Sequence, residues 1–500
     1  MNETLVAYVK RLLKHSSIYG VGTLLYRAVA LILLPLYTRY LSTGEYGDLE
    51  LFFITSSFLV MILQFGMGSA IFRAVIYRDQ HDPVLIVSTA FFFMLLINLV
   101  CVFGLCLFSR ELSIAIFEVP DQAYLLRLIF VTDFFLVMSI LPMAKLRIDE
   151  RSLLFTIVAA GNFFCGVTLT VLFLVVFQWG IEGIFWAQLI NAIIFTIVYI
   201  SIISHEIRLK FSWNELKDML GYGLPLVPAS VATSILMLSN RYFLRHLGTA
   251  EEVGIFSAGY RMAQIVALIV NAFQMAWPTL LFTIVKEEKA RDTFSRLFSY
   301  FVFVLVTVSL AIAIFGRELL VLITTPNYVA AHQIIPVLLL SNILWGFFYM
   351  TSVGIQVKKK TIYSAIIIGI AALVNLVLNY WLISIPDFRL AGAALASFVA
   401  NFIVAVATLI ISLRFYYIHY EYLKILQIFL LATLAYMIGL VVPTDRIFIT
   451  LILKTMIIIL FLVSLYLGHF FTAGEIDRAK AFLKMIYALV TRPKVESQGR

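Results

Sequence analysis

Charged residues are scarce in this sequence of 500 residues, and their scarcity excludes a soluble protein. Asp, Glu, Lys and Arg together make up 13% of the chain, whereas hydrophobic residues make up 62%. Ordinary soluble proteins are about 25% charged. The mean hydropathy is +1.00, and a water-soluble core cannot hide so much apolar surface. The composition therefore predicts an all-α polytopic membrane protein.

Cysteine is also scarce, and the usual motifs of enzymes are missing. All three cysteines lie inside apolar runs, which predicts free thiols. No glycine-rich phosphate loop of the Walker type occurs, so we expect no ATP hydrolysis by this chain. No group of His, Cys and carboxylates has metal-ligand spacing. The sequence thus predicts a protein that is not an enzyme and has neither a metal nor another cofactor.

Uncharged runs of about 20 residues predict helices that cross the hydrocarbon core. Twelve such runs cover 51–72, 83–109, 152–181, 183–204, 219–240, 262–285, 297–316, 319–357, 361–386, 390–413, 425–444 and 455–474. Two further spans, 16–38 and 122–143, are interrupted by charges, which makes about fourteen helices. The run 319–357 is too long for one span, so residues 324–327 are expected to form a loop before a helix near 329–355. The first span is too long for a cleavable signal peptide.

The positions of Lys and Arg predict the orientation. With the N-terminus in the cytoplasm, 26 of these residues lie in cytoplasmic segments and six in the opposite loops. Basic residues favour the cytoplasmic side of membrane proteins, so both termini are predicted to be cytoplasmic. The net charge of +9 follows from this bias and does not require a nucleic-acid partner.

An internal repeat divides the chain. Residues 39–47 resemble 245–254 at an offset of 206 to 207, and 183–187 resemble 392–396 at an offset of 209. This offset spans six helices, and an even number preserves orientation, so the repeats are predicted to be parallel. We therefore expect two six-helix lobes followed by two further helices. The boundaries are 1–210 for helices 1–6, 211–418 for helices 7–12, 419–474 for helices 13–14 and 475–500 for a cytoplasmic tail.

The matched segments carry structural signals. Ser42 with Glu45 and Thr249 with Glu252 predict capping boxes that open helices 2 and 8. The patterns at 183–187 and 392–396 place small residues four apart, which allows helices 6 and 12 to approach their neighbours closely.

The N-terminal sequence resembles that of the polysaccharide exporters. The resemblance rests on Ser-Ile-Tyr-Gly-Val-Gly at 17–22, Arg27, Leu-Leu-Pro-Leu-Tyr-Thr-Arg-Tyr-Leu-Ser at 33–42 and Glu-Tyr-Gly at 45–47. These exporters are the Wzx-type flippases of the multidrug/oligosaccharidyl-lipid/polysaccharide superfamily. The resemblance implies two six-helix lobes around a central cavity that opens alternately to each side. Two additional C-terminal helices resemble those of the lipid II flippase, in which they border a groove for the lipid tail.

The same resemblance implies a function. The chain is expected to move undecaprenyl-diphosphate-linked oligosaccharide units across the bacterial inner membrane. The product would be a surface polysaccharide such as O-antigen, capsule or exopolysaccharide. Membrane lipids, a polysaccharide polymerase and a chain-length regulator are the expected partners, without nucleic acid.

Charged residues inside the spans are the candidate site residues, because each costs at least about 2.5–3.5 kcal/mol to insert at mid-bilayer. Arg27 in helix 1 and Arg261 in helix 8 suit a diphosphate, since a guanidinium donates paired hydrogen bonds and stays charged. The alternatives are pairing of Arg27 with Asp133 and snorkelling of Arg261 toward the outer interface. Arg241, predicted at the outer end of helix 7, and its neighbour Asn240 complete the expected cavity.

Two further charges have other predicted roles. Asp133 is interpreted as the one acid well inside a span, where it either couples transport to an ion or neutralises Arg27. Lys454 in helix 14 is a candidate for the lipid groove.

Two other functions remain open at this stage. A small-molecule exporter of the same superfamily would select cations with acids, whereas the charges inside these spans are mostly basic. A non-transporting scaffold of a polysaccharide synthesis complex would need no charged lumen.

Overall fold

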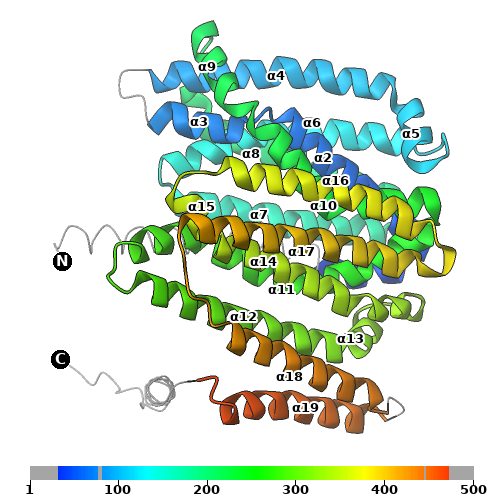
Figure 1. The fold of residues 1–500 in the computed structure, drawn as a ribbon. Helices are drawn as coiled ribbons and strands as arrows, with labels where there is room; N and C mark the ends of the chain where they lie inside the picture. Colours follow the sequence, from blue (N-terminus) through cyan, green and yellow to red (C-terminus); the bar gives the residue numbers. More distant parts are fainter. Residues whose placement is uncertain (1–31, 77–81, 444–445, 472–500) are drawn as a thin grey trace, which may run out of the picture. The chain divides into compact units, whose positions relative to one another are not determined.

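The computed structural model describes residues 32–76, 82–443 and 446–471, which form helices and the connections between them (Figure 1). No strand occurs among these residues, so the all-α prediction is confirmed for the described part of the chain. Thirteen helices in it are long and apolar enough to cross a membrane. Each coincides with one predicted span. The fourteenth predicted span, 16–38, lies mostly outside the described residues and stays a prediction.

Among the described residues of the first part of the chain, seven α-helices follow a helical segment at 32–40. They are α2 (Thr43–Leu63), α3 (Met67–Ile76), α4 (Pro83–Leu107), α5 (Ser109–Phe117), α6 (Ala123–Ile148), α7 (Ser152–Val171) with the π-helical η1 (Leu172–Val176), and α8 (Gly180–Ile203) with the 3-10 turn η2 (Ser204–Glu206).

The remaining helices follow in the second part. They are α9 (Trp213–Gly223), α10 (Leu226–Leu247), α11 (Ala250–Ile284), α12 (Ala290–Ile314), α13 (Gly316–Ile323), η3 (Pro326–Gln333), α14 (Ile335–Thr351), α15 (Val353–Val357), α16 (Ile362–Ile383), η4 (Pro386–Phe388), α17 (Arg389–Phe415), α18 (Tyr422–Val441) and α19 (Ile447–Leu467). The predicted break in the run 319–357 is confirmed at Thr325, which is extended. The predicted bounds are wrong, because η3 already begins at Pro326 and the α-helix expected near 329–355 begins at Ile335.

Several helices extend beyond the predicted uncharged runs. The uncharged run of the second span begins at residue 51, but α2 begins at Thr43, as the capping box predicted, and contains Glu50. The seventh was predicted to end at residue 240, but α10 continues to Leu247. The prediction that Arg241 lies at the outer end of its helix is therefore wrong. The uncharged runs end at charged residues by definition. Glu50 and Arg241 nevertheless lie inside helices, because the fold gives each of them a partner there.

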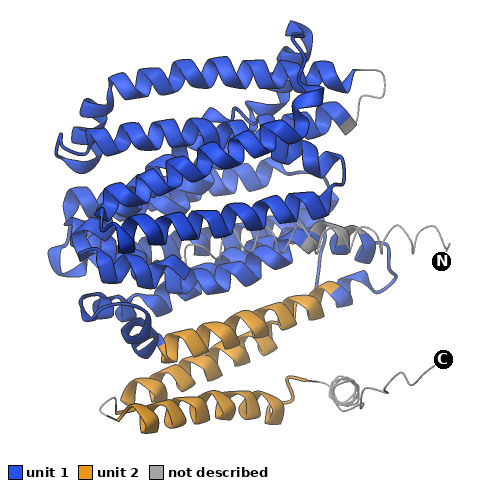
Figure 2. Ribbon diagram, turned by 180° about the vertical axis from the view of Figure 1, so that it is seen from behind, with its two compact units in different colours: residues 1–293, 316–418 blue, residues 294–315, 419–500 orange. Residues whose placement is uncertain are grey.

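The helices form two compact units (Figure 2). Unit 1 comprises residues 1–293 and 316–418, and unit 2 comprises 294–315 and 419–500. Within unit 1, α6 packs against α2, α3, α4 and α8, while α17 packs against α14 and α16. Helix α2 also packs against α10 and α11, so it joins the helices of the first predicted lobe to those of the second. The lobe boundaries themselves stay a prediction.

Small residues permit close packing at equivalent places of the two repeats. A Cβ built on Gly183 of α8 would lie 3.1 Å from the carbonyl oxygen of Phe173 in η1. A Cβ built on Gly392 of α17 would lie 2.9 Å from the carbonyl oxygen of Leu382 in α16. The predicted close approach of these helices to their neighbours is confirmed at both glycines.

Unit 2 contains most of α12 together with α18 and α19, and Glu421 connects two of them. The Glu421 carboxylate accepts hydrogen bonds from Ser299 of α12 at 2.7 Å and from Lys424 of α18 at 2.8 Å. Burial raises the pKa of the Glu421 carboxyl, but these hydrogen bonds and the charge of Lys424 outweigh that effect and leave the pKa lowered. The charged carboxylate therefore stabilises this unit.

Candidate functional site

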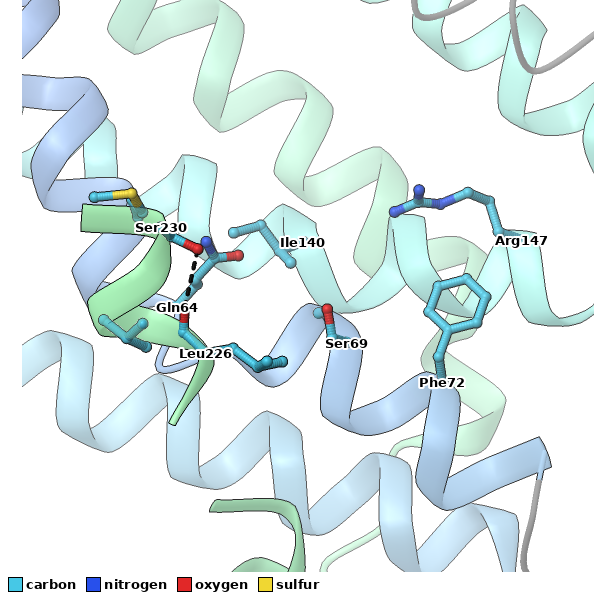
Figure 3. Close-up of a pocket in the computed structure, with 11 residues that line it drawn as sticks. Gln64, Ser69, Phe72, Ile140, Arg147, Leu226 and Ser230 are labelled. Atoms are coloured by element: carbon cyan, nitrogen blue, oxygen red, sulfur yellow. Dashed lines mark hydrogen bonds between the residues drawn. The ribbon is translucent and has the colours of Figure 1, made fainter. Parts of the chain in front are cut away.

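One end of α2 borders a polar cavity of about 280 Å3 in unit 1. The end of α2, the helices α3 and α6, and the beginning of α10 form its walls (Figure 3). Its polar side chains are Gln64, Ser69, Arg147 and Ser230. The sequence predicts that this is the cytoplasmic end of these helices. A cavity of this size is close to the lower limit of small-molecule sites, about 300 Å3.

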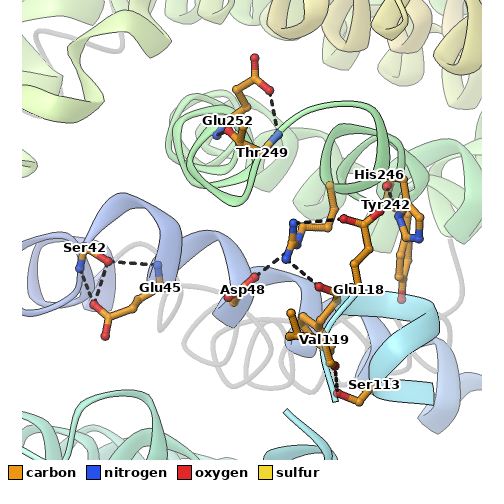
Figure 4. A network of polar contacts seen from close by, with 12 residues as sticks. Ser42, Glu45, Asp48, Ser113, Glu118, Val119, Tyr242, His246, Thr249 and Glu252 are labelled. Atoms are coloured by element: carbon orange, nitrogen blue, oxygen red, sulfur yellow. Dashed lines mark hydrogen bonds and ion pairs between the residues drawn. The ribbon is translucent and has the colours of Figure 1, made fainter. Parts of the chain in front are cut away.

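The opposite end of α2 begins with a capping box, and so does α11. Ser42 Oγ accepts a hydrogen bond from the Glu45 amide, and the Glu45 carboxylate accepts one from the Ser42 amide at 2.8 Å. Thr249 and Glu252 repeat this arrangement at the beginning of α11, with the returning bond at 2.9 Å (Figure 4). Both predicted capping boxes are confirmed.

The beginnings of α2 and α11 lie in direct contact, and the contact is reciprocal. A Cβ built on Gly47 would overlap the carbonyl oxygen of Ala250, and one built on Gly254 would overlap the carbonyl oxygen of Thr43. These four residues are equivalent pairs in the internal repeat, at an offset of 207. Such reciprocity is expected where two related segments meet across a local two-fold axis. Glycine at both positions allows the backbones to close this end.

Arg245 of α10 adds polar contacts at the same end. Its guanidinium lies 3.6 Å from the carboxylate of Asp48 in α2 and 3.7 Å from that of Glu118. It also donates a hydrogen bond to the carbonyl oxygen of Phe117 at 2.7 Å. A second pair joins Arg389 to Glu252 at 3.4 Å. The contacts of Arg245 join α10 to the first half of the chain at the predicted outer end, whereas the Arg389 pair joins α17 to α11.

Arg261 of α11 lies deeper between the same two helices. It is 9% exposed, and it pairs with the carboxylate of Glu50 in α2. Its Nε donates a hydrogen bond to the Tyr46 hydroxyl at 2.7 Å. The Tyr46 ring meets the edge of Tyr328 with 5.8 Å between ring centroids. A buried arginine and a buried carboxylate thus join the first half of the chain to the second.

Glu50 and Tyr46 are the site residues that the sequence reasoning missed. The interpretation of Asp133 as the one acid well inside a span is wrong, because Glu50 lies inside α2 and is 5% exposed. The signal was present, since the capping box at Ser42 sets the beginning of the helix eight residues before Glu50. The uncharged run began at residue 51, and so excluded Glu50 from the span.

Arg241 and Asn240 lie within α10 and face different partners. Arg241 is 2% exposed, its guanidinium lies 3.9 Å from the ring centroid of Tyr260, and it donates a hydrogen bond to the Met237 carbonyl. Asn240 donates hydrogen bonds to the Ala393 carbonyl at 2.6 Å and to the Ser397 hydroxyl at 2.8 Å. Both side chains therefore have partners on the helices that surround them.

Asp133 of α6 is fully buried and has one partner among the described residues. Ser56 of α2 donates a hydrogen bond to its Oδ1 at 2.5 Å. Its Oδ2 has no hydrogen-bond partner in the described part of the chain. Arg27, the predicted alternative partner, lies outside the described residues. The ion-coupling and pairing roles of Asp133 thus both stay predictions.

Lys454 lies in unit 2, in the middle of α19, and is 5% exposed. Its predicted role in a lipid groove is not tested. Across residues 32–76, 82–443 and 446–471, no cluster of three or more His, Cys, Asp and Glu residues could hold a metal ion.

Comparison with known proteins identifies the family. Residues 12–283, which are more than half of the chain, match a family described as "Polysaccharide biosynthesis protein". The chain belongs to this family. The resemblance carried by the N-terminal motif is confirmed at this level.

Two curated relatives from Haemophilus influenzae strain KW20 / Rd are similar to the chain. "Lsg locus putative protein 1" is 22% identical over 341 residues, which are 67% of this chain and 82% of the relative. An "uncharacterized membrane protein" is 22% identical over 290 residues, which are 56% of this chain and 67% of the relative.

Solved transporters share the fold of this polysaccharide biosynthesis family member. The lipid II flippase MurJ in an inward closed conformation matches with a TM-score of 0.74 and 16% identity, over 90% of this chain and 99% of MurJ. An inward-facing multidrug transporter of the MATE family, from the MOP superfamily, matches with a TM-score of 0.65 and 16% identity, over 77% of this chain and 93% of its own. At these identities the likeness establishes the fold.

Proposed function

We propose that this chain is a flippase of the MOP superfamily that moves undecaprenyl-diphosphate-linked oligosaccharide units from the cytoplasmic to the outer leaflet by alternating access. Its membership of the polysaccharide biosynthesis family and its MurJ-like fold support transport of a lipid-linked glycan. The transported unit would serve O-antigen, capsule or exopolysaccharide synthesis in the bacterial inner membrane, with both termini in the cytoplasm. A polymerase and a chain-length regulator are the proposed protein partners.

The buried Arg261 is the observation that carries this proposal. A guanidinium inside a membrane span is expensive unless an anion neutralises it. Glu50 supplies that anion in the present arrangement. A diphosphate carries more negative charge and can accept two hydrogen bonds from one guanidinium, so it can replace Glu50 on Arg261. Exchange of one anion for the other would free α2 from α11 and allow the closed end to open.

Other residues complete the proposed site. Arg27 in the first helix is the proposed second ligand of the diphosphate, and Lys454 a proposed contact of the lipid tail. Asp133 is proposed either to couple transport to an ion or to neutralise Arg27. Arg241 and Asn240 were predicted cavity residues, and their contacts with α11 and α17 respectively favour a structural role for both.

The second candidate is a small-molecule exporter, and the MATE-like fold is the observation that favours it. Such an exporter would confer resistance to toxic cations, whereas a flippase would not. A scaffold without transport activity would retain assembly of the synthesis complex and normal export after Arg261→Ala.

A deletion strain provides the decisive experiment. Its lipid-linked glycans are extracted and assigned to a membrane leaflet, and its surface polymer is measured. The proposal expects a complete diphosphate-linked unit to accumulate on the cytoplasmic side, with the surface polymer missing. Complementation with Arg261→Ala should fail, whereas Arg110→Ala, an exposed arginine of α5, should restore export. An unchanged lipid-linked pool and normal surface polymer in the deletion strain would refute the proposed function.

A further inference from the structure

The polar cavity at the predicted cytoplasmic end contains a cation that the proposed translocation site does not use. Arg147 of α6 extends its guanidinium into this cavity, 5.5 Å from the centroid of the Phe72 ring (Figure 3). Gln64 and Ser69 add polar groups from α2 and α3, and Ser230 adds a hydroxyl from α10. Arginine together with amide and hydroxyl groups is a set of donors suited to phosphate oxygens.

An apolar groove of about 450 Å3 lies next to this cavity, between α2, α10 and α16. Every residue that lines it is apolar, and those that matter here are Ile62, Val231, Ile235, Gly369, Leu373 and Leu376. Its residues on α10 run from Val227 to Ile235, which corresponds to a length of roughly 12 Å at 1.5 Å per residue. An alkyl chain is the kind of ligand that such a lining accepts.

The cavity and the groove adjoin each other. Val227 lines both, and the consecutive residues Met61 and Ile62 of α2 line the cavity and the groove respectively. A cationic polar cavity beside an apolar groove is complementary to an amphiphile with an anionic head and a hydrocarbon tail. All the lining residues belong to unit 1.

We propose that this composite site, defined as the cavity around Arg147 together with the α2–α10–α16 groove, binds the polyprenyl diphosphate carrier before translocation. The diphosphate lies against Arg147, and the first isoprenoid units lie in the groove. The inference rests on the proposed function and deepens it, since it assigns the carrier an entry site separate from Arg261. It also places the start of the tail on α10 and α16, whereas the family resemblance implied the last two helices.

Gly369 allows the groove to be filled without disturbing the protein. A Cβ built on Gly369 meets nothing within 4 Å, so Gly369→Leu projects into the groove. Leucine also favours a helix more than glycine does. Gly104 of α4 is a matched control, because a Cβ built there also meets nothing within 4 Å and Gly104 does not line the groove. Arg147→Gln removes the cation, and its control is Arg151→Gln, an exposed arginine four residues further along the chain.

The experiment measures binding of undecaprenyl diphosphate to the purified full-length chain, with phosphatidylglycerol as the second probe. Size-exclusion chromatography confirms that each variant is folded. We expect Gly369→Leu and Arg147→Gln each to weaken binding of undecaprenyl diphosphate by about tenfold or more, and both controls to stay within about twofold of wild type.

Two outcomes would overturn the composite site. One is undecaprenyl diphosphate affinity that stays at the wild-type level in both variants. The other is that phosphatidylglycerol binds as tightly as undecaprenyl diphosphate and that both substitutions weaken its binding to the same extent. The site would then accept any anionic phospholipid. The glycan pool of the deletion strain tests the flippase itself, so the composite site can fail while the proposed function stands.

Discussion

A disulfide across the closed end offers a direct test of alternating access. The Cβ of Ala250 lies 3.9 Å from a Cβ built on Gly44, between the beginnings of α11 and α2. Cysteine pairs that form disulfides have Cβ atoms about 3.5–4.5 Å apart, so Gly44→Cys with Ala250→Cys should crosslink without movement of the backbone. The chain has three native cysteines, all free, and their replacement by alanine gives a clean background.

The expected result follows from the need for this end to open. With the disulfide formed, α2 and α11 cannot separate, and export of the glycan should fall by at least about tenfold, as expected when one of two required states is removed. A reductant should restore export in the same cells. Mass spectrometry of linked peptides measures the extent of crosslinking, and surface polymer measures export.

Two results would refute the reasoning. Normal export with complete crosslinking would mean that this end does not open during transport. Failure to crosslink under oxidation would contradict the close approach of the two helices. Each single cysteine variant serves as a control and should export normally under both conditions.

Three further predictions concern the ionic and polar contacts. Arg261→Ala leaves Glu50 buried without its cation, so it should lower the free energy of unfolding by about 3–5 kcal/mol and abolish export. Adding Glu50→Gln should recover most of that stability in thermal unfolding, but no export. Asn240→Ala should cost about 1–3 kcal/mol and leave export measurable, whereas complete loss of export in a folded variant would assign Asn240 to the substrate. Because the folded-state pKa of Glu421 is lowered, its stabilising contribution is present above the unfolded pKa and lost as pH falls through the folded pKa. Glu421→Gln should therefore flatten the acid side of the stability profile, and an unchanged profile would contradict this assignment.

The positions of the helices could be predicted from the sequence because a bilayer imposes a simple rule. Each crossing needs about 20 apolar residues, and uncharged runs of that length identified twelve of the thirteen spans found in the described residues. The remaining one, at 122–143, was predicted although Arg127 and Asp133 interrupt it. The capping boxes at Ser42 and Thr249 were predictable for a similar reason, since they depend on residues three apart. The family was predictable as well, because its N-terminal motif is continuous in the chain.

The ends of the helices and the partners of the charges could not be obtained in this way. A charge marks the end of a span only if it has no partner inside the membrane, and Glu50 has Arg261 as its partner 211 residues away. Arg241 likewise has a partner within the helices, since its guanidinium lies against the Tyr260 ring of α11. Pairings over such distances depend on which helices lie side by side.

The sequence by itself determined an all-helical membrane protein, its internal repeat and its family, because composition, spacing and short motifs are local properties. Only the tertiary structure decided that equivalent glycines of the repeat meet reciprocally and that Arg261 is neutralised across α2 and α11. It also decided that the cavity around Arg147 adjoins the α2–α10–α16 groove. These features arise where segments distant in the chain come together, and no local pattern encodes that proximity.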